Sequence, residues 1–526
     1  MSISQPRAKF SPNLFNAEEV RIPPLETGTD CFQPVLSCSA DFPIELFESA
    51  ISQLVHHPEY NSTLILRSEV LTESKSIFPP ETPDLRGFSK VDCIHRRLLP
   101  RRPGRDGGLE QYCTFYSRTI SEPNNVPDTL VLTPIIPPGS RLPYYHPAVS
   151  HIAFRYLCIA DRPSTLRIEV LPLPGTPIDS NSRLYRTCLA LLETLHRYGW
   201  GAMVNYKKRV VHDHLVPREE YQDLYLIMRE RHKHLVDTWQ EVTDPLKHVF
   251  EDIGIATFLM LFWKETYTHQ DLMNPKASDL DCPWSTWPRP PGGFLDFGCG
   301  NGLLTHILTA EGYQGKGIDV RARASWAQYP DTTREQLHVY AFDPTSTSSC
   351  SFIRPGVFII GNHADELTPW VPVLATLHKA SGYLSIPCCA WSFDAKFERS
   401  SASFFPIPIS PVDTQSPLAP ESRIHRETGL DLQFVEELNL GGDGSHTSSY
   451  SIYRIWLSTL SLHCGWEIEC EMLRIPSTRN WAIAGRRRLP NVTDEEALDN
   501  AQAIIEQVVT RGVFKTRHPE GKARDH

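Results

Sequence analysis

Short apolar runs alternate with helical patterns between residues 293 and 390, and most of the runs end next to a polar side chain. Runs of this length bounded by turn residues are typical of buried strands, whereas apolar positions spaced three and four apart are typical of helices. Strands are expected at 294–297, 337–342, 357–361 and 383–387, with a further strand ending at Asp319. Repeated strand–helix units predict an α/β fold with a parallel sheet, whose carboxyl ends line a ligand crevice.

The segments on either side of this alternation have other patterns. Upstream, the spacing of apolar residues predicts helices at 185–198, 219–239 and 245–267. Downstream, it predicts one helix and an antiparallel pair of strands, at 453–462, 467–473 and 480–486. A capping box formed by Thr493 and Glu496 predicts a last helix that runs to about residue 510.

The first 150 residues are rich in proline and serine and contain only short β-like runs, so a loop-rich accessory region is expected there. A chain of 526 residues also exceeds what one hydrophobic core usually supports. We expect four parts: an N-terminal accessory region, a helical segment, the α/β domain, and a C-terminal helix with its tail. Their expected bounds are 1–180, 181–282, 283–490 and 491–526.

A glycine loop follows the first strand of the α/β region. Its residues are Gly298, Cys299, Gly300, Asn301 and Gly302. Glycines at every second position let a backbone approach a ligand closely, and the helix behind them offers free N–H groups. Leu303 stands where a dinucleotide fingerprint requires glycine. With Asp296 before the loop and Asp319 placed to bind a ribose diol, the pattern resembles the S-adenosylmethionine site of class I methyltransferases.

Composition narrows the class of protein. The net charge of −10 argues against a uniformly basic coat for nucleic acid but leaves room for local basic patches. Thirteen scattered cysteines, without a secretory apolar segment at the start, indicate reduced thiols in a cytosolic or nuclear protein, and we expect a cytoplasmic one. The longest apolar run, 253–263, is too short to span a bilayer, so no membrane insertion is expected.

Polar side chains follow the fourth and fifth strands of the α/β region. Asn362 and Asp365 come after the fourth strand, where the alternative is a helix cap with solvated acids. After the fifth strand, Asp394 and Lys396 are candidates for orienting or deprotonating a hydroxyl, the alternative being a surface charge pair. The adjacent cysteines 388 and 389 have poor spacing for zinc and are expected to be buried, so no metal site is predicted.

Three compact basic patches stand out in this acidic chain. The first is Lys207, Lys208 and Arg209; the second is Arg96, Arg97, Arg101 and Arg102; the third is Arg486, Arg487 and Arg488. Each alone would be interpreted as a solvated face. Together, interleaved with aromatic residues, they favour contacts with phosphates, and the first two are our candidates for binding RNA.

Six separated segments resemble one family in the same order. They are YGWGAMVNYKKRVVHDHLVP, TDPLKHVFEDIGIATFL, FLDFGCGNGLLTHILTAEGYQGKGIDVR, GNHADELTPWVPVLA, IPCCAWSFDAKF and RIPSTRNWAIAGR. This part of the chain, about 190–488, is similar to the tRNA (uracil-2′-O-)-methyltransferase family in its fungal form. The resemblance implies a Rossmann-like class I methyltransferase domain that transfers a methyl group from S-adenosylmethionine to the ribose of uridine-44 in serine tRNA.

The resemblance also implies roles for single residues. The expected donor-binding residues are Asp296, Gly298, Gly300, Asn301, Gly302, Asp319, Asp343 and Asn362. The expected catalytic residues are Asp365, Lys396 and Asp394. RNA would be held by the basic patches and the N-terminal region, and no stable protein partner is expected.

Two other functions are compatible with parts of this pattern. One is a class I methyltransferase that acts on protein or on a small molecule, which the basic patches argue against. The other is a catalytically inactive RNA-binding subunit. The intact set of Asp296, the loop glycines and Asp319 argues against an inactive protein, because such a protein has no reason to keep a donor pocket.

Overall fold

The computed structural model describes residues 8–14, 22–119, 126–158, 163–206, 208, 210–268, 282–343, 351–401, 403–407, 432–441 and 448–515. The chain forms two compact units, Met1–Lys207 and Lys208–His526. The helix α2 (Arg183–Met203) therefore belongs to the first unit, whereas the sequence groups it with the helical segment that begins at 181. It belongs there because Leu184, Cys188 and Leu192 pack into the core of that unit.

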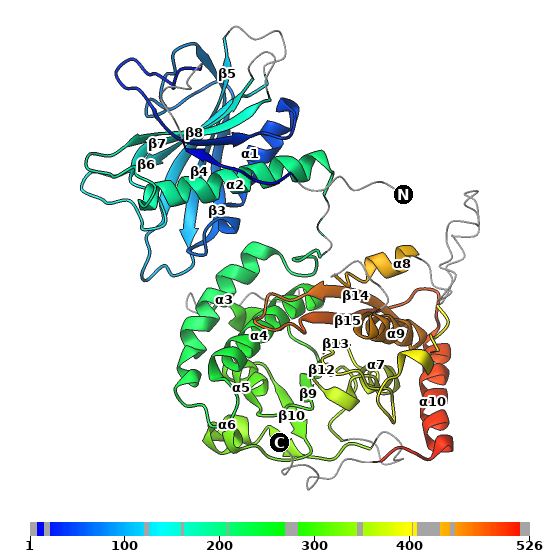
Figure 1. The fold of residues 1–526 in the computed structure, drawn as a ribbon. Coiled ribbons are helices and arrows are strands. Elements are labelled where there is room, and N and C mark those ends of the chain that lie inside the picture. The colour runs from blue at the N-terminus through cyan, green and yellow to red at the C-terminus, as the bar shows by residue number, and fades with distance from the viewer. Residues whose placement is uncertain are drawn as a thin grey trace, which may run out of the picture. The chain divides into compact units, whose positions relative to one another are not determined.

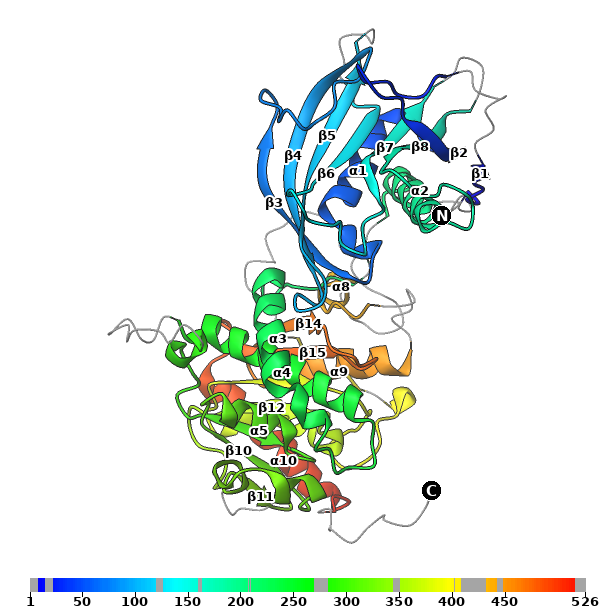
Figure 2. The same ribbon diagram turned by 90° about the vertical axis from the view of Figure 1, so that its left-hand side faces the viewer.

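The N-terminal unit is built on one antiparallel sheet in the order β1-β2-β8-β7-β6-β5-β4-β3 (Figures 1 and 2). The strands are β1 (Asn13–Leu14), β2 (Gln33–Ser39), β3 (Ile65–Ser74), β4 (Phe88–Pro100), β5 (Leu109–Arg118), β6 (Thr129–Ile135), β7 (Val149–Leu157) and β8 (Thr165–Pro172). α1 (Phe47–His56) and α2 share an apolar core with these strands. The expectation of a loop-rich region is wrong, because prolines such as Pro134 lie within or between long strands and do not end the sheet.

The C-terminal unit contains a seven-stranded sheet in the order β11-β10-β9-β12-β13-β15-β14. The strands are β9 (Phe294–Phe297), β10 (Gly315–Asp319), β11 (Leu337–Val339), β12 (Phe358–Asn362), β13 (Gly382–Ile386), β14 (Trp466–Met472) and β15 (Trp481–Arg488). The first five in chain order are mutually parallel, and β15 runs antiparallel to both β13 and β14. The expected antiparallel pair is therefore confirmed. The direction of the strand order reverses between β9 and β12, where ligand crevices form in open α/β sheets.

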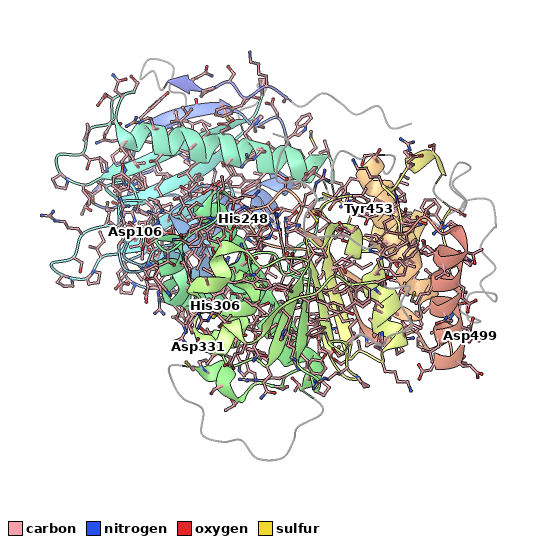
Figure 3. All side chains as sticks on the ribbon, turned by 90° about the horizontal axis from the view of Figure 1, so that it is seen from below. Asp106, His248, His306, Asp331, Tyr453 and Asp499 are labelled. Atoms are coloured by element: carbon pink, nitrogen blue, oxygen red, sulfur yellow. The ribbon has the colours of Figure 1, made fainter. Side chains whose placement is uncertain are left out.

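Helices cover both faces of this sheet. One face carries α4 (Pro245–Tyr267) and α5 (Leu303–Ala310), whose apolar side chains pack with those of β9 and β12. The other carries α7 (Trp370–Leu377), α9 (Ser449–His463) and α10 (Asp494–Arg511). Figure 3 shows the two sets on opposite sides of the strands, with His306 on α5 and Asp499 on α10. The remaining helices of this unit are α3 (Arg218–His232), α6 (Asp331–Arg334) and α8 (Leu432–Glu437).

Local sequence signals account for how these helices begin. Asp244 caps α4 by accepting a hydrogen bond from the backbone N–H of Leu246 at 3.0 Å, and Pro245 occupies the first helical position. Thr493 caps α10 through the N–H of Glu496, as the capping box predicts. The middle of α4, residues 253–263, is buried on all sides, which fits its apolar circumference. No helix in the described part of the chain has both the length and the apolarity needed to cross a membrane.

Candidate active site

The glycine loop joins the end of β9 to the start of α5 at the carboxyl edge of the sheet. Gly298, Gly300 and Gly302 all have left-handed backbone angles, with φ of +83°, +54° and +75°. Side chains with a Cβ avoid this region, so the path of the loop favours glycine at all three positions. A Cβ added at Gly300 would meet no atom within 4 Å. The space above Gly300 is therefore open to a ligand.

The loop is fixed to the neighbouring strand by Asp319. The N–H of Gly300 donates to Asp319 Oδ2 at 2.9 Å, and the N–H of Arg321 donates to Oδ1 at 3.3 Å. The N–H groups of Gly298 and Cys299 donate to the carbonyl oxygen of Ile318 at 3.0 Å. Asp319 thus orders the loop as well as projecting from the end of β10, where the sequence expected it to bind a ribose.

Asp296 lies on the other side of the loop in a buried position on β9. Thr305 Oγ1 donates to Asp296 Oδ2 at 2.8 Å. Burial and, to a smaller extent, the charge of Asp319 raise the pKa of Asp296 to about 7, although the hydrogen bond from Thr305 lowers it. Burial also raises the pKa of Asp252 on α4 well above its usual range, and Asp296 adds to that effect. A buried carboxyl, Asp296, and a half-buried one, Asp252, therefore lie close enough for charge on the first to disfavour ionisation of the second.

A first cavity of about 390 Å³ opens at the ends of β10 and β12, and we call it the β10-side cavity. This volume suits a small-molecule ligand. It is lined by Gly298, Gly300, Ile318, Asp319, Val320, Arg323, Tyr340, Phe342, His363, Ala364, Asp365, Glu366, Leu367, Trp370, Trp391, Phe393, Asp394, Val513, Phe514 and Lys515. The aromatic side chains supply flat apolar walls, and the glycine backbone and Asp319 supply polar groups along one side.

A second cavity, also of about 390 Å³, lies toward the first turns of α4, and we call it the α4-side cavity. It is lined by Lys247, His248, Glu251, Asp252, Asp296, Gly298, Cys299, Gly300, Asn301, Leu304, Asn362, His363, Cys388, Ser477, Thr478 and Arg479. The two cavities share Gly298, Gly300 and His363. The glycine loop therefore separates an aromatic cavity from a charged one, and His363 borders both.

The end of β12 contacts the acids of α4. Asn362 Nδ2 donates to Asp252 Oδ1 at 3.2 Å, and His363 Nε2 lies 3.1 Å from Glu251 Oε1. Burial alone would raise the pKa of Glu251, but the hydrogen bond and charge of His363, with smaller effects of Ser477 and Lys247, hold it below its usual value. Glu251 is therefore a carboxylate at neutral pH and can accept the proton of the His363 ring.

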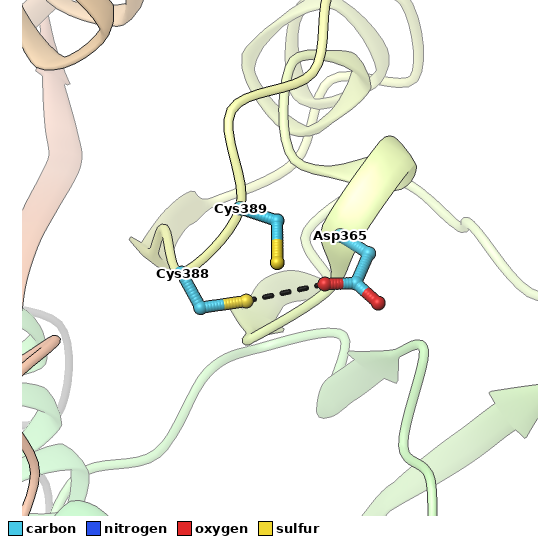
Figure 4. A group of neighbouring side chains, drawn as sticks. All are labelled: Asp365, Cys388 and Cys389. Carbon is cyan, nitrogen blue, oxygen red and sulfur yellow. Dashed lines mark hydrogen bonds between the residues drawn. The ribbon is translucent and has the colours of Figure 1, made fainter. Parts of the chain in front are cut away.

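Asp365 contacts the two adjacent cysteines, as Figure 4 shows. The Cys388 thiol donates to Asp365 Oδ1 at 3.2 Å, and one ligand atom from each of Asp365, Cys388 and Cys389 lies within 4.8 Å of the others. Burial, and then Asp365, raise the pKa of both thiols. The hydrogen bond accounts for the contact without an ion. Cys388 is half-buried and Cys389 is exposed, so the expectation that both cysteines are buried is wrong.

The other residues expected to be catalytic lie apart from one another. Asp394 lines the β10-side cavity, and Arg511 Nε lies 3.0 Å from its Oδ2, although that oxygen accepts no well-aligned hydrogen bond from the described residues. Lys396 is exposed and is absent from the described lining of both cavities. The structure therefore brings Asp365 and Asp394 to one cavity and does not bring Lys396 there.

Three further residues that were expected to bind the donor lie at different places around the site. Asn301 lines the α4-side cavity, and its Oδ1 accepts a hydrogen bond from the N–H of Leu303 at 2.9 Å. Asn362 lines the same cavity. Asp343 lies beyond the end of β11, which is shorter than expected, and Tyr340 and Phe342 line the β10-side cavity in its vicinity.

The arginine patch of the N-terminal unit divides into buried and exposed members. The Arg96 guanidinium is buried and donates to Gln111 Oε1 and to the carbonyl oxygens of Leu54 and Val55. The expectation that Arg96 binds RNA is therefore wrong, because its charge is enclosed in the protein. Arg97 Nη2 lies 2.6 Å from Glu110 Oε1, whereas Arg101 and Arg102 are exposed.

The two remaining basic patches differ in how many of their residues the structure describes. Lys208 is exposed, and the expected RNA-binding residues Lys207 and Arg209 lie outside the described residues. In the third patch, Arg486 and Arg487 each pair with Glu469, at 2.6 and 3.1 Å. Two of the three arginines of the third patch are therefore neutralised by acids of the neighbouring strand β14, and Arg488 lies 3.8 Å from Asp494 on α10.

Sequence reasoning missed the contact between His363 and Glu251. A signal was present on each side of it: an acid pair, Glu251 and Asp252, interrupts the otherwise apolar α4, and His363 follows an apolar strand. It also missed Val513, Phe514 and Lys515, which follow α10 and line the β10-side cavity. The ring of Phe514 meets that of Trp370 edge to face at 6.0 Å, and no periodicity marks this segment.

Comparison with known proteins adds two kinds of finding. A family model described as "TRM44-like, N-terminal bet v1-like domain" matches residues 11–209, and one described as "Predicted AdoMet-dependent methyltransferase" matches residues 215–285 and 284–344. The tRNA (uracil-O(2)-)-methyltransferase of Schizosaccharomyces pombe is 34% identical over 498 residues, covering 88% of this chain and 86% of that protein. The proteins of the same name from Neurospora crassa and Saccharomyces cerevisiae are 30% and 28% identical, covering 97% and 84% of this chain and the same shares of their own lengths.

Proposed function

The chain belongs to the tRNA (uracil-O(2)-)-methyltransferase family, and we propose that it methylates the ribose 2′-oxygen of a uridine in tRNA with S-adenosylmethionine as the donor. The observation that carries this proposal is the glycine loop, anchored to Asp319 and bordered by one cavity on each side. A methyl transfer between two large substrates needs adjoining sites that meet at the reacting atoms. For the acceptor we propose uridine-44 of serine tRNA, as the sequence resemblance implies.

The residues of the β10-side cavity fit the donor. The strand order supports a Rossmann-like sheet, in which a nucleoside binds where the order reverses. The open space above Gly300 would admit the donor backbone, and Asp319 is placed to accept hydrogen bonds from its ribose. Tyr340 and Phe342 would flank the adenine. When bound, S-adenosylmethionine supplies a methyl group on a positively charged sulfur, which leaves as a neutral thioether.

The protein's own contribution is to align the acceptor with the methyl group and to accept the proton of the 2′-hydroxyl. Holding the two reactants in line accounts for much of the acceleration of such a displacement. A carboxylate or imidazole that takes the hydroxyl proton adds about 10²–10⁴-fold. Asp365 and Asp394 line the β10-side cavity and are our candidates for orienting groups there, whereas Lys396 is exposed and lies outside the described lining of both cavities.

The N-terminal unit is the proposed RNA-contacting part. Arg101 and Arg102 are exposed in the loop after β4, and exposed arginines contribute phosphate contacts that are independent of base sequence. We propose that the protein acts in the cytoplasm as a single chain on its tRNA.

Transfer of a labelled methyl group to tRNA tests this proposal. We expect incorporation into tRNA that is lost after RNase treatment, and alkaline hydrolysis should leave dinucleotides at the modified position, because a 2′-O-methyl group blocks cleavage there. Label that survives RNase, or that is released as a base-methylated nucleoside, would overturn the proposal. Calorimetry with S-adenosylmethionine on the same preparation separates an inactive enzyme from one offered the wrong RNA.

A further inference from the structure

The α4-side cavity combines a proton-accepting group with positive charge at its entrance. Lys247 and Arg479 are exposed at its rim, and His248 lies in the first turn of α4, where Figure 3 labels it. Arg479 is held over the ring of Tyr450 at 3.9 Å. Separate elements, α4 and the β14–β15 connection, therefore each contribute a cation to the lining of this cavity. A phosphodiester chain that crosses its opening would meet positive charge from both elements.

Two polar atoms at the base of this cavity have no partner. Asn362 Oδ1 and His363 Nδ1 are both buried, and neither has a hydrogen-bond partner among the described residues. Leaving such atoms unpaired costs about 1–3 kcal/mol each, so a ligand that pairs them would gain that energy. Both atoms belong to the end of β12, next to the glycine loop.

His363 is held in a conformation that orients its ring. Its φ is +51°, in the left-handed region, which is uncommon for a residue other than glycine and is concentrated at functional sites. Its Nε2 lies 3.1 Å from Glu251 Oε1, and the Glu251 side chain is only 5% exposed. A proton on Nε2 would be bound by the carboxylate, which leaves Nδ1 with a free lone pair. This is the orientation that a buried acid imposes on a catalytic histidine.

We propose that the α4-side cavity binds the ribose of the acceptor nucleotide and its flanking phosphates, and that His363 takes the 2′-hydroxyl proton while Glu251 is its positioning residue. The inference rests on the proposed function and names its acceptor site. The O2′–H bond breaks and the proton passes to His363 Nδ1. The oxygen lone pair forms the new O–CH₃ bond, and the electrons of the S–CH₃ bond return to sulfur. His363 suits this role because, among the described residues, its side chain borders both cavities.

The other titratable groups around the cavity are less suited to this step. Asp296 is buried and Asp252 half-buried, both have raised pKa values, and Asp252 already accepts a hydrogen bond from Asn362. The Cys388 thiol donates a hydrogen bond to Asp365. Lys247 and Arg479 are cations at the rim. The charges of these groups affect the stability of an imidazolium at His363, and Glu251 is the carboxylate in direct contact with its ring.

Three variants test the proposal under single-turnover conditions with saturating tRNA and donor. His363→Asn keeps a residue that tolerates positive φ, and should reduce the methyl-transfer rate at least about 100-fold. Glu251→Gln keeps a hydrogen-bond acceptor but removes the charge. It should reduce the rate less, and should move the inflection of the pH–rate profile to lower pH, because the imidazolium loses its negative neighbour. His363→Gly should regain part of its rate when imidazole is added.

Binding measurements give a readout that is independent of activity. Donor affinity by calorimetry should stay within about threefold of wild type in all three variants. Their melting temperatures should stay within a few degrees of wild type. His234→Asn, at an exposed histidine of the same unit, is the matched control and should transfer methyl normally. If wild type methylates tRNA and His363→Asn does so at an equal rate, or if imidazole fails to restore any rate, the inference is wrong while the proposed function stands. If wild type binds the donor and methylates no tRNA, the proposed function fails.

Discussion

The two cavities that meet at the glycine loop are similar in size but differ in their walls. Six aromatic side chains line the β10-side cavity: Tyr340, Phe342, Trp370, Trp391, Phe393 and Phe514. The described lining of the α4-side cavity contains no phenylalanine, tyrosine or tryptophan, and is made mainly of acids, amides, histidines and cations. The first is built to enclose a flat, largely apolar group, and the second to hold charges and transfer a proton.

The difference shows that the glycine loop is constrained by the shape of the site on one side and by charged side chains on the other. On the β10 side, the backbone and Asp319 set the shape of the site, so small changes in shape should abolish binding. On the α4 side, two carboxyls lower the stability of the folded state when they are charged, because Asp296 and Asp252 lie where their charged forms are disfavoured. Substitutions on the two sides should therefore affect different measurements.

The largest effect is expected from Gly300→Val. The branched side chain would occupy the open space above the loop, and we expect no measurable donor binding by calorimetry. The left-handed φ of +54° adds strain of about 1–3 kcal/mol to the folded state. Gly175→Val is the control, since it has φ of +79°, open space around its Cβ and a place in the N-terminal unit. Normal donor affinity in Gly300→Val would show that the donor does not bind in the β10-side cavity.

The next effect concerns the stability of the α4 side and its dependence on pH. Because the folded-state pKa of Asp296 is raised from 3.8 to about 7, its protonated form favours folding, and that stability is lost as pH rises through this window. Asp296→Asn lacks the titration. As pH rises from 4 to 7, the unfolding free energy of Asp296→Asn should therefore increase relative to that of wild type by up to about 4 kcal/mol.

Urea unfolding at a series of pH values measures this difference. A constant gap between wild type and Asp296→Asn from pH 4 to pH 7 would show that the carboxyl does not titrate in this range. Thr305→Val is a useful companion, because it removes the hydrogen bond to Asp296 Oδ2. Its unfolding free energy should fall more steeply than that of wild type between pH 4 and pH 7.

A smaller effect separates donor binding from the proton step. Asp319→Ala removes the acceptor of the Gly300 N–H and the expected partner of the ribose, and should weaken donor binding by about 1–3 kcal/mol. Glu251→Gln, on the other side of the loop, should leave donor affinity within about threefold of wild type. Equal losses of donor affinity in the two variants would mean that the cavities do not divide the substrates between them.

The smallest effect is expected outside both cavities. Arg101→Ala combined with Arg102→Ala should weaken tRNA binding up to about tenfold, and should reduce the slope of log affinity against log salt by about one unit for each phosphate that is no longer neutralised. Donor binding should not change. Arg96→Ala is the contrasting variant, since removing this buried guanidinium should lower the melting temperature instead. An unchanged salt slope in the double variant would mean that the exposed pair is only a solvated face.

Much of the sheet that carries the site follows from sequence patterns. The apolar runs locate β9, β12 and β13, and the glycine spacing identifies the loop, because both depend on residues that are adjacent in the chain. The N-terminal sheet was not predictable in the same way. Its strands contain polar and proline residues, such as Pro134 within β6, and its core forms only when α1 and α2 cover it.

The charged half of the site could not be predicted because it depends on contacts between distant residues. Glu251 and His363 are 112 positions apart and meet only when α4 packs against the sheet. The basic patches show the opposite error. Arg96 and Arg97 are neighbours in sequence, yet they alternate across β4, so that one is buried and the other is paired at the surface. Spacing alone cannot distinguish a phosphate contact from a buried hydrogen-bond network.

A crystal structure of the protein with S-adenosylhomocysteine would show directly whether the two cavities divide the substrates between them. We predict that the adenosine occupies the β10-side cavity, with its ribose at Asp319 and its base between Tyr340 and Phe342. The sulfur should face the opening of the α4-side cavity beside His363. A product molecule whose adenosine lies in the α4-side cavity, or away from the glycine loop, would contradict the division of the site into a donor half and an acceptor half.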